Sequence, residues 1–229
     1  MSAISPSPGR PRGRPRAFDR DAALAKAGEL FWRLGYEGTS IADLTEALGI
    51  TPQSLYAAFK SKADLYREGL DWYQREMGAG TTAALQMPSV FQAFDHALLG
   101  AAGAFCDPDR PKGCMISTAA LTCATENAPI AATLTGLRNA SLAAFQARLD
   151  RGVADGELRA DTDTASLARY LGAIVQGMSV QARDGATAED LTAIARIALR
   201  ELDRQRAEPA SRRKLRGDKP ASLVKIREK

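Results

Sequence analysis

Residues that build catalytic and metal sites are scarce in this sequence. Its 229 residues include one histidine, His96, and three cysteines, Cys106, Cys114 and Cys123. An odd number of cysteines does not form a disulfide framework, and no second histidine or carboxylate–thiol cluster stands beside His96 at the spacing of metal ligands. No nucleophile–base pair is evident either. We therefore expect that the protein is not an enzyme and that it holds no metal and no cofactor. The three cysteines are expected to be reduced thiols in the core, with redox sensing as the alternative.

Long hydrophobic runs are missing as well. No stretch of about eighteen apolar residues occurs, and the opening "MSAISPSPGRPR" lacks the apolar region of a signal peptide. The sequence thus predicts a cytoplasmic protein with no membrane partner. With 45% hydrophobic residues, the chain can still build the core of one or two domains without disulfides or a metal.

Basic charge is concentrated at the two ends of the chain. Residues 1–16 hold four arginines and no acidic residue, and residues 204–229 hold ten basic and three acidic residues, so the part between them is mildly acidic. This distribution is typical of a protein that touches DNA locally rather than coating it.

The first of these ends, with proline and glycine among its arginines, predicts a flexible basic arm. Its Arg12-Gly13-Arg14-Pro15 resembles the core of an AT-hook, in which an arginine pair lies along the narrow minor groove of A·T-rich DNA. An unstructured solubilising tail is the alternative for this arm.

Helix-start signals crowd the first third of the chain. Ser40, Thr51 and Ser61 each stand where a side-chain oxygen can cap a helix, and Pro52 occupies a favoured first helical position. Gly49 can end the first of these helices, which leaves only a three-residue turn before Thr51. Such a turn between two short helices is typical of a helix-turn-helix, although an ordinary helical hairpin of a bundle has the same pattern.

Residues 16 to about 66 resemble the N-terminal DNA-binding domain of the TetR family of bacterial transcription regulators. The shared parts are the G-Y-x-G-T-S approach to the second helix, the A-x-x-L-G-I turn and the S-L-Y-x-x-F-x-S-K run. The resemblance covers the first third of the chain by motif and the rest only by its helical pattern. It implies an all-α fold, with a three-helix DNA-binding domain followed by a helical ligand-binding and dimerisation domain.

The resemblance also implies which side chains face double-stranded operator DNA. Together with the arginine pair of the arm, the predicted DNA-binding residues are Arg12, Arg14, Thr39, Ser40, Thr51, Pro52, Gln53, Ser54, Tyr56, Lys60 and Lys62. The chemistry of three of them agrees, because Gln53 can pair bidentately with adenine, and Ser54 and Thr51 can bond several base edges. A merely solvated helix surface is the alternative for Gln53 and Ser54.

One position departs from the family. Ala58 stands where many members carry a histidine or tyrosine that contacts phosphate, so more of the anchoring falls on Tyr56, Lys60 and Lys62. Tyr56 has its own alternative, an aromatic at the edge of the core with its hydroxyl in water.

From Pro88 onward the periodicity of apolar residues stays helical. The stretch "CMISTAALTCATENAP" is expected to be a helix whose mixed apolar and hydroxyl face suits the wall of a pocket for a small, mostly apolar ligand, or equally a plain core. The predicted ligand-binding residues are Phe91, Phe94, Phe105, Met115, Thr118, Leu121 and Phe145.

We expect four segments: a basic arm at 1–16, a helix-turn-helix domain at 17–78, a ligand-binding and dimerisation domain at 79–204, and a basic tail at 205–229. The resemblance implies that the last two helices of the third segment form a homodimer interface. The predicted function is that of a bacterial transcriptional repressor released from a palindromic operator by a small-molecule effector. The alternative is an architectural or ligand-independent DNA-binding protein.

Overall fold

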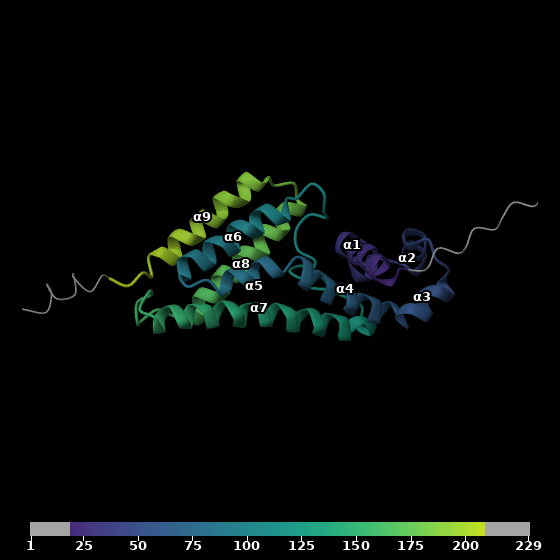
Figure 1. Cartoon of the computed structure of the whole chain (residues 1–229), viewed down its shortest axis with the longest axis horizontal. Coiled ribbons are helices and arrows are strands. Elements are labelled where there is room, and N and C mark those ends of the chain that lie inside the picture. The colour runs from purple at the N-terminus through teal and green to yellow at the C-terminus, as the bar shows by residue number, and fades with distance from the viewer. Residues whose placement is uncertain (1–18, 209–229) are drawn as a thin grey trace, which may run out of the picture.

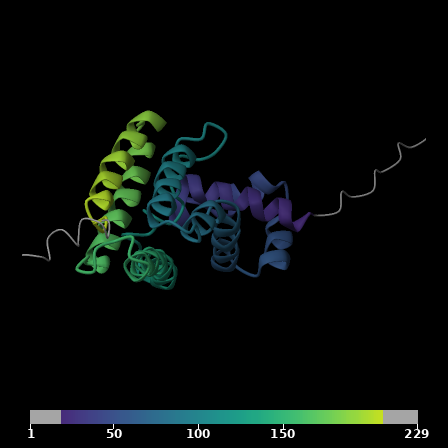
Figure 2. The ribbon, with the colours of Figure 1, turned by 60° about the vertical axis from the view of Figure 1, so that its left-hand side comes forward.

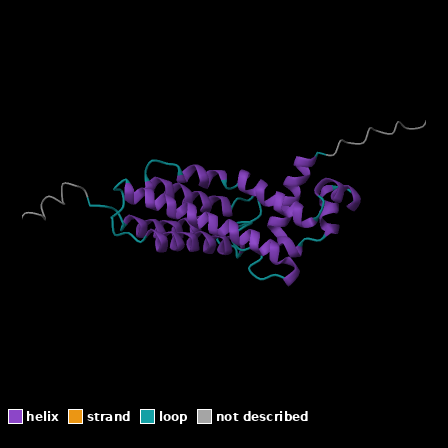
Figure 3. Cartoon of the chain, turned by 90° about the horizontal axis from the view of Figure 1, so that it is seen from below, coloured by secondary structure: helices purple, strands orange, loops and turns teal. Residues whose placement is uncertain are grey.

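The computed structural model describes residues 19–208, and the regular elements of that part are helices, which confirms the all-α prediction (Figures 1 and 3). In chain order they are α1 Arg20–Gly38, α2 Ile41–Leu48, α3 Pro52–Phe59, α4 Lys62–Glu76, α5 Ala79–Leu85, α6 Val90–Phe105, the 3-10 helix η1 Thr125–Asn127, α7 Ala128–Ala154, α8 Thr164–Arg183 and α9 Ala188–Asp203. The arm with Arg12 and Arg14, and the tail from residue 209 onward, lie outside the described residues.

The short helices begin and end where their capping residues predict. The Ser40 hydroxyl accepts a hydrogen bond from the Asp43 N–H at 3.0 Å, and the Asp43 carboxylate accepts one from the Ser40 N–H at 2.7 Å. Gly49 ends α2 with a left-handed φ of 66°, and the Thr51 hydroxyl caps α3. These local bonds produce the abrupt stop and restart of the helix-turn-helix.

Helices α1–α4, which we call the head, pack around one hydrophobic cluster, the head core. Its largest fully buried side chains are Phe31, Leu44, Leu55, Phe59, Leu65, Tyr66 and Leu70. Gly28 lets α1 approach α4 closely, because a Cβ at this position would lie 2.5 Å from the ring of Trp72. Three residues from beyond the head, Met115, Ile130 and Leu134, complete the head core.

Helices α5–α9, which we call the body, enclose a second cluster, the body core. In this core α6 packs against α5, α8 and α9, and α7 packs against α8. Figure 2 shows α8 and α9 side by side at one edge of the body. The long α7 runs along one side of the molecule from the body to the head, where its first turns supply Ile130 and Leu134 (Figure 1).

The segment between α6 and α7, residues 106–127, contains no α-helix, so the helix expected over "CMISTAALTCATENAP" is wrong. Tertiary contacts take over the backbone groups that a helix would pair. The Cys114 N–H donates to the Ser179 hydroxyl at 2.8 Å, and the carbonyls of Ile116 and Ala119 accept hydrogen bonds from Arg138. Gly113 precedes this stretch with a φ of +73°, which breaks the helical path at its start.

Candidate DNA-binding surface and ligand cavity

One face of α3 is buried and the other is exposed. Leu55 and Phe59 lie in the head core, while Gln53 and Ser54 are exposed and Tyr56 keeps 46% of its surface accessible. Pro52 is exposed at the first turn of the same helix. The polar face is therefore displayed by a rigid apolar support.

The hydroxyl side chains near the starts of α2 and α3 differ in their exposure and in their hydrogen bonds. The Thr51 hydroxyl accepts from the Ser54 N–H at 3.2 Å and lies 3.0 Å from the Ser54 hydroxyl, so both are held at the start of α3. Ser40 is exposed at the start of α2. Thr39 is fully buried, and its hydroxyl donates to the Gly35 carbonyl at 2.7 Å, so this predicted DNA-binding residue is not displayed on the surface with the others.

Two lysines flank the turn between α3 and α4. Lys60 is exposed and adopts a φ of 62° and a ψ of −56°, values that are strained for a residue with a Cβ. The Lys62 ammonium lies 4.4 Å from the centroid of the Tyr36 ring, and burial lowers its pKa while Glu37 and Asp43 act to raise it. Lys62 is thus held at the first turn of α4, with its position fixed by an aromatic face.

Arg20, at the start of α1, connects α3 to α4 through an ion pair and a cation–π contact that the sequence pattern does not predict. The Arg20 guanidinium donates to both carboxylate oxygens of Glu68 at 2.9 and 2.7 Å and lies 4.6 Å from the Phe59 ring centroid. Its Nε also donates to the Ala58 carbonyl at 3.4 Å. Because Arg20 and Glu68 are 48 residues apart, no local pattern signals this contact.

A cavity of about 580 Å³ lies where the head meets the body. Trp32 and Tyr73 from the head line it together with side chains of α5 to α8, including Phe105 and Phe145 of the predicted ligand set. Burial raises the pKa of Tyr73, with Cys114 as the next cause, so its hydroxyl stays neutral on the cavity wall. Cavities of this size accommodate small organic molecules.

The other predicted ligand residues are dispersed. Thr118 and Leu121 line a second, more open cavity of about 430 Å³. Phe94 is fully buried against Phe145, with ring centroids 5.3 Å apart, and Met115 lies in the head core. The central carbon of the Arg206 guanidinium lies 3.5 Å from the centroid of the Phe91 ring. Phe91, Phe94 and Met115 line neither cavity.

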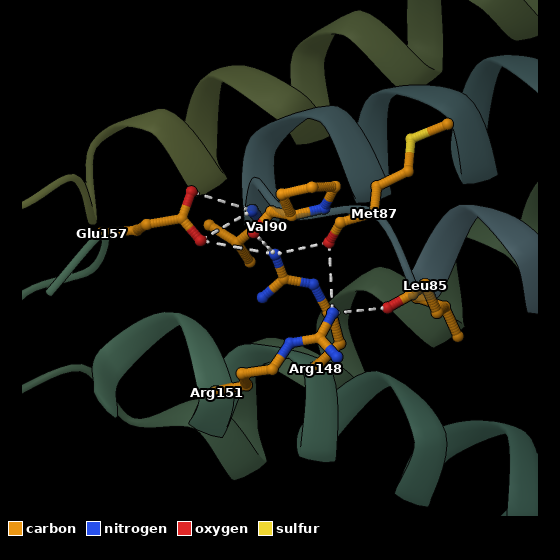
Figure 4. Close-up of polar contacts among 7 residues, drawn as sticks. Leu85, Met87, Val90, Arg148, Arg151 and Glu157 are labelled. Carbon is orange, nitrogen blue, oxygen red and sulfur yellow. Dashed lines mark hydrogen bonds and ion pairs between the residues drawn. The ribbon is translucent and has the colours of Figure 1, made fainter. Parts of the chain in front are cut away.

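A polar cluster fastens the α5–α6 loop to α7 (Figure 4). Arg148, whose side chain is only 1% exposed, donates to the Met87 and Pro88 carbonyls and to Glu157 at 3.3 Å. Arg151 donates to the Leu85 and Met87 carbonyls at 2.9 and 3.1 Å. Since Leu85 and Met87 also line the larger cavity, this cluster sets the position of one of its walls.

None of the helices within residues 19–208 has the length and apolar character to cross a bilayer. That same stretch contains no group of three or more His, Cys, Asp or Glu side chains placed to hold a metal ion.

Comparison with known proteins agrees with the helix-turn-helix geometry. Residues 23–68 match the family of bacterial regulatory proteins of the tetR type, and residues 93–198 match the tetracyclin repressor-like C-terminal domain. The chain is 41% identical over 191 residues to the HTH-type transcriptional repressor ComR of Escherichia coli K12, an alignment that covers 82% of this chain and 91% of ComR.

A second relative and a solved structure extend this agreement. The uncharacterized HTH-type regulator YezE of Bacillus subtilis 168 is 35% identical over 161 residues, which cover 69% of this chain and 83% of YezE. A cysteine mutant of the regulator CifR, complexed with 26-base-pair operator DNA, is 43% identical with a TM-score of 0.79 and covers 82% of this chain and 98% of its own. The chain belongs to the TetR family of bacterial transcriptional regulators.

Proposed function

We propose that this protein is a cytoplasmic transcriptional repressor that binds a palindromic operator as a homodimer and is released by a small, mostly apolar ligand. The observation that carries the proposal is the α2–turn–α3 unit, in which Leu55 and Phe59 anchor α3 and leave its polar face in solvent. The CifR relative, which is complexed with operator DNA, supports the same use of this unit.

In this proposal α3 lies in the major groove and Gln53 is the main reader of bases, because a free amide can pair bidentately with adenine. Ser54 and Thr51 read neighbouring base edges with less selectivity. Tyr56 and Lys60, on the same exposed surface, contact phosphates and set the orientation of the helix. Lys62, at the first turn of α4, is the third phosphate contact, and Arg12 and Arg14 reach the adjacent minor groove.

The exposed side of α8 and α9 supports the homodimer. Val180 and Ile197 are exposed there, Ile197 by 56%, although both are large apolar residues. Gly177 and Ala173 on α8 are small, which permits close approach of a second helix pair. A two-fold dimer built on this side would present two copies of α3 to half-sites about one helical turn apart.

The cavity supports regulation by a ligand over the alternative of an architectural DNA-binding protein. An architectural protein needs only the head and its basic extensions, whereas this chain places a cavity of about 580 Å³ between the head and the body. A ligand that favours a spacing of the two heads unsuited to the operator weakens DNA binding to the same extent that DNA weakens ligand binding.

The test begins with selection of bound sequences from random DNA by the purified full-length protein, followed by footprinting on the selected site. We expect a discrete palindrome protected symmetrically by one dimer. Diffuse protection along the fragment would favour the architectural alternative, and a monomer bound to one half-site at working concentrations would contradict the homodimer.

A further inference from the structure

The wall of the larger cavity carries a positive charge that no acidic side chain of the described lining offsets. Among residues 19–208 its lining includes no aspartate, glutamate or lysine, and the permanently charged side chain there is Arg138 of α7. The remaining lining is mainly apolar or uncharged, with Leu142, Phe145 and Val175 among its apolar members. A cationic ligand would therefore meet a guanidinium with no carboxylate to offset it, whereas an anionic ligand would meet its counter-charge.

Arg138 has hydrogen-bonding capacity to spare. Its Nη1 donates to the carbonyls of Ile116 and Ala119, both at 3.1 Å, and its Nη2 donates to the Thr135 hydroxyl at 3.1 Å. A guanidinium has five N–H groups, so one on Nε and one on Nη2 remain without a partner among the described residues. Nε and Nη2 form one edge of the guanidinium, and their spacing matches the two oxygens of a carboxylate.

The charge of Arg138 is also uncompensated. In the described part of the chain no carboxylate lies within 4.0 Å of this guanidinium, although Arg20, Arg67, Arg148 and other arginines there have such a partner. The three groups that accept from Arg138 are two carbonyls and a hydroxyl, which are all neutral. A half-buried cation beside an apolar cavity with two unused N–H groups is a binding element for an anion.

We propose that the larger cavity takes an amphipathic carboxylate, with its carboxylate on the Nε/Nη2 edge of Arg138 and its apolar part along the cavity. This proposal rests on the proposed function, because it names the chemical class of the effector. It adds that charge selects the ligand, whereas size and apolarity alone would admit neutral and cationic amphiphiles equally.

The same arginine connects the ligand to the head. Through the Ile116 and Ala119 carbonyls, Arg138 holds the segment 106–127, and this segment also contacts the head directly. Met115 is part of the head core, and Glu37 of α1 accepts from the Ala124 N–H at 2.8 Å and the Asn127 amide at 2.6 Å. A carboxylate that shifts the Arg138 guanidinium therefore moves a segment that is fastened to the DNA-binding head.

The experiment compares decanoate, decan-1-ol and decylamine as probes on the full chain in the absence of DNA. Binding is followed by titration calorimetry and by the emission of the two tryptophans, of which Trp32 lines the cavity and Trp72 does not. We expect decanoate to bind at least about tenfold more tightly than decan-1-ol, and decylamine to bind more weakly than both. Equal affinities, a preference for decylamine, or no binding of carboxylates from six to fourteen carbons would overturn the proposal.

Variants locate the preference on one residue. Arg138→Gln should reduce the preference for decanoate over decan-1-ol to about twofold or less, and Arg138→Lys should restore part of it, because a lysine keeps the charge without the bidentate edge. Arg169→Gln is the control, since Arg169 of α8 is exposed and lines neither cavity. A preference that persists in Arg138→Gln or disappears in Arg169→Gln would contradict the assignment.

A separate measurement keeps this proposal distinct from the proposed function. Operator binding is titrated in the presence of saturating decanoate, and release of the operator is expected. If decanoate binds through Arg138 and the operator stays bound, the carboxylate site stands and the ligand-released repressor fails.

Discussion

The side chain of Arg183, at the end of α8, donates a hydrogen bond of 2.9 Å to the backbone carbonyl oxygen of Trp32 in α1. The two residues are 151 positions apart, and their bond joins a body helix of the proposed dimer interface to the DNA-binding head. Trp32 also lines the larger cavity. The same residue therefore borders the proposed ligand site and accepts, through its backbone carbonyl, a hydrogen bond from the body.

The first prediction concerns this bond. Arg183→Met should cost about 1–2 kcal/mol of unfolding free energy and weaken operator binding several-fold, because a charged hydrogen bond between head and body is lost. Thermal unfolding and DNA titration check both effects. Arg169→Met, on the same helix, removes an exposed arginine for which no hydrogen bond or ion pair is found, and it should change neither quantity appreciably. Equal effects of the two variants would mean that the bond does not hold the head.

The second prediction separates base reading from phosphate contact. Gln53→Ala should relax the preference for one base pair in each half-site by about 1–3 kcal/mol, whereas Tyr56→Phe should weaken binding to all sequences alike. Selection of bound sequences with each variant is the measurement. An unchanged preference for Gln53→Ala would remove Gln53 from the reading residues.

The third prediction uses the strained backbone of Lys60, with its φ of 62°. Lys60→Gly should raise the unfolding free energy by about 0.5–1 kcal/mol by relieving the strain, while operator affinity falls and the slope of log K against log salt flattens by about one unit. Lys60→Ala is the control, since it removes the charge and keeps the Cβ. It should show the same loss of affinity without the gain in stability. A stability gain in both variants would indicate that the lysine charge, rather than the backbone, is unfavourable.

The fourth prediction concerns Glu157 and pH. Burial of Glu157 acts to raise its pKa, but hydrogen bonds from Ser89, the Val90 N–H and Arg148 outweigh it, and the net pKa is lowered from its ordinary value of 4.5. A carboxyl whose pKa is lower in the folded state stabilises the fold above its ordinary pKa, and this stabilisation is lost as the pH falls through the folded-state pKa.

Glu157→Gln should therefore lower the unfolding free energy by about 2–4 kcal/mol at pH 7, because Arg148 is left as a buried charge without its acidic partner. At pH below 4 the difference from the natural chain should shrink. Thermal unfolding across this pH range is the measurement. Asp161→Asn, at the exposed pair with Arg159, serves as control and should have little effect at either pH. A constant difference at all pH values would contradict the role of the Glu157 charge.

The fifth prediction concerns the basic arm, which lies outside the described residues. Deletion of residues 1–16 should lower operator affinity and flatten the slope of log K against log salt by about two to four units, because fewer counterions are released. If Arg12 and Arg14 lie in the minor groove, the loss should be greater for operators flanked by A·T than by G·C. Salt titrations on both operators measure this, and an unchanged slope would show that the arm does not contact DNA.

Local signals in the sequence were sufficient to predict the helix-turn-helix. The capping residues Ser40 and Thr51, and the glycine at position 49, act within one turn of their own positions, so a sequence pattern can reveal them. The α6–α7 segment could not be predicted in this way. Its backbone groups are taken by Ser179 and Arg138, which are distant in the sequence, and this tertiary competition overrides helical periodicity.

The cavity shows the same limit. Aromatic residues were sensible candidates for its wall, but periodicity does not distinguish a side chain facing a cavity from one facing a core. Phe105 and Phe145 line the cavity, while Phe94 fills the core beside them. Trp32 and Arg138 were missed because their place on the wall follows from how α1 and α7 cross the junction between head and body. The contacts proposed for the DNA-binding residues stay predictions.

The composition of the head core constrains the order in which the chain folds during synthesis. The four helices of the head leave the ribosome before Met115, Ile130 and Leu134, which fill part of their core. At about 5–20 residues per second, a wait on the order of several seconds separates the end of α4 from the arrival of Leu134. During that interval the nascent head exposes an apolar gap, so the helix-turn-helix becomes fully packed only after more than half of the protein has been made.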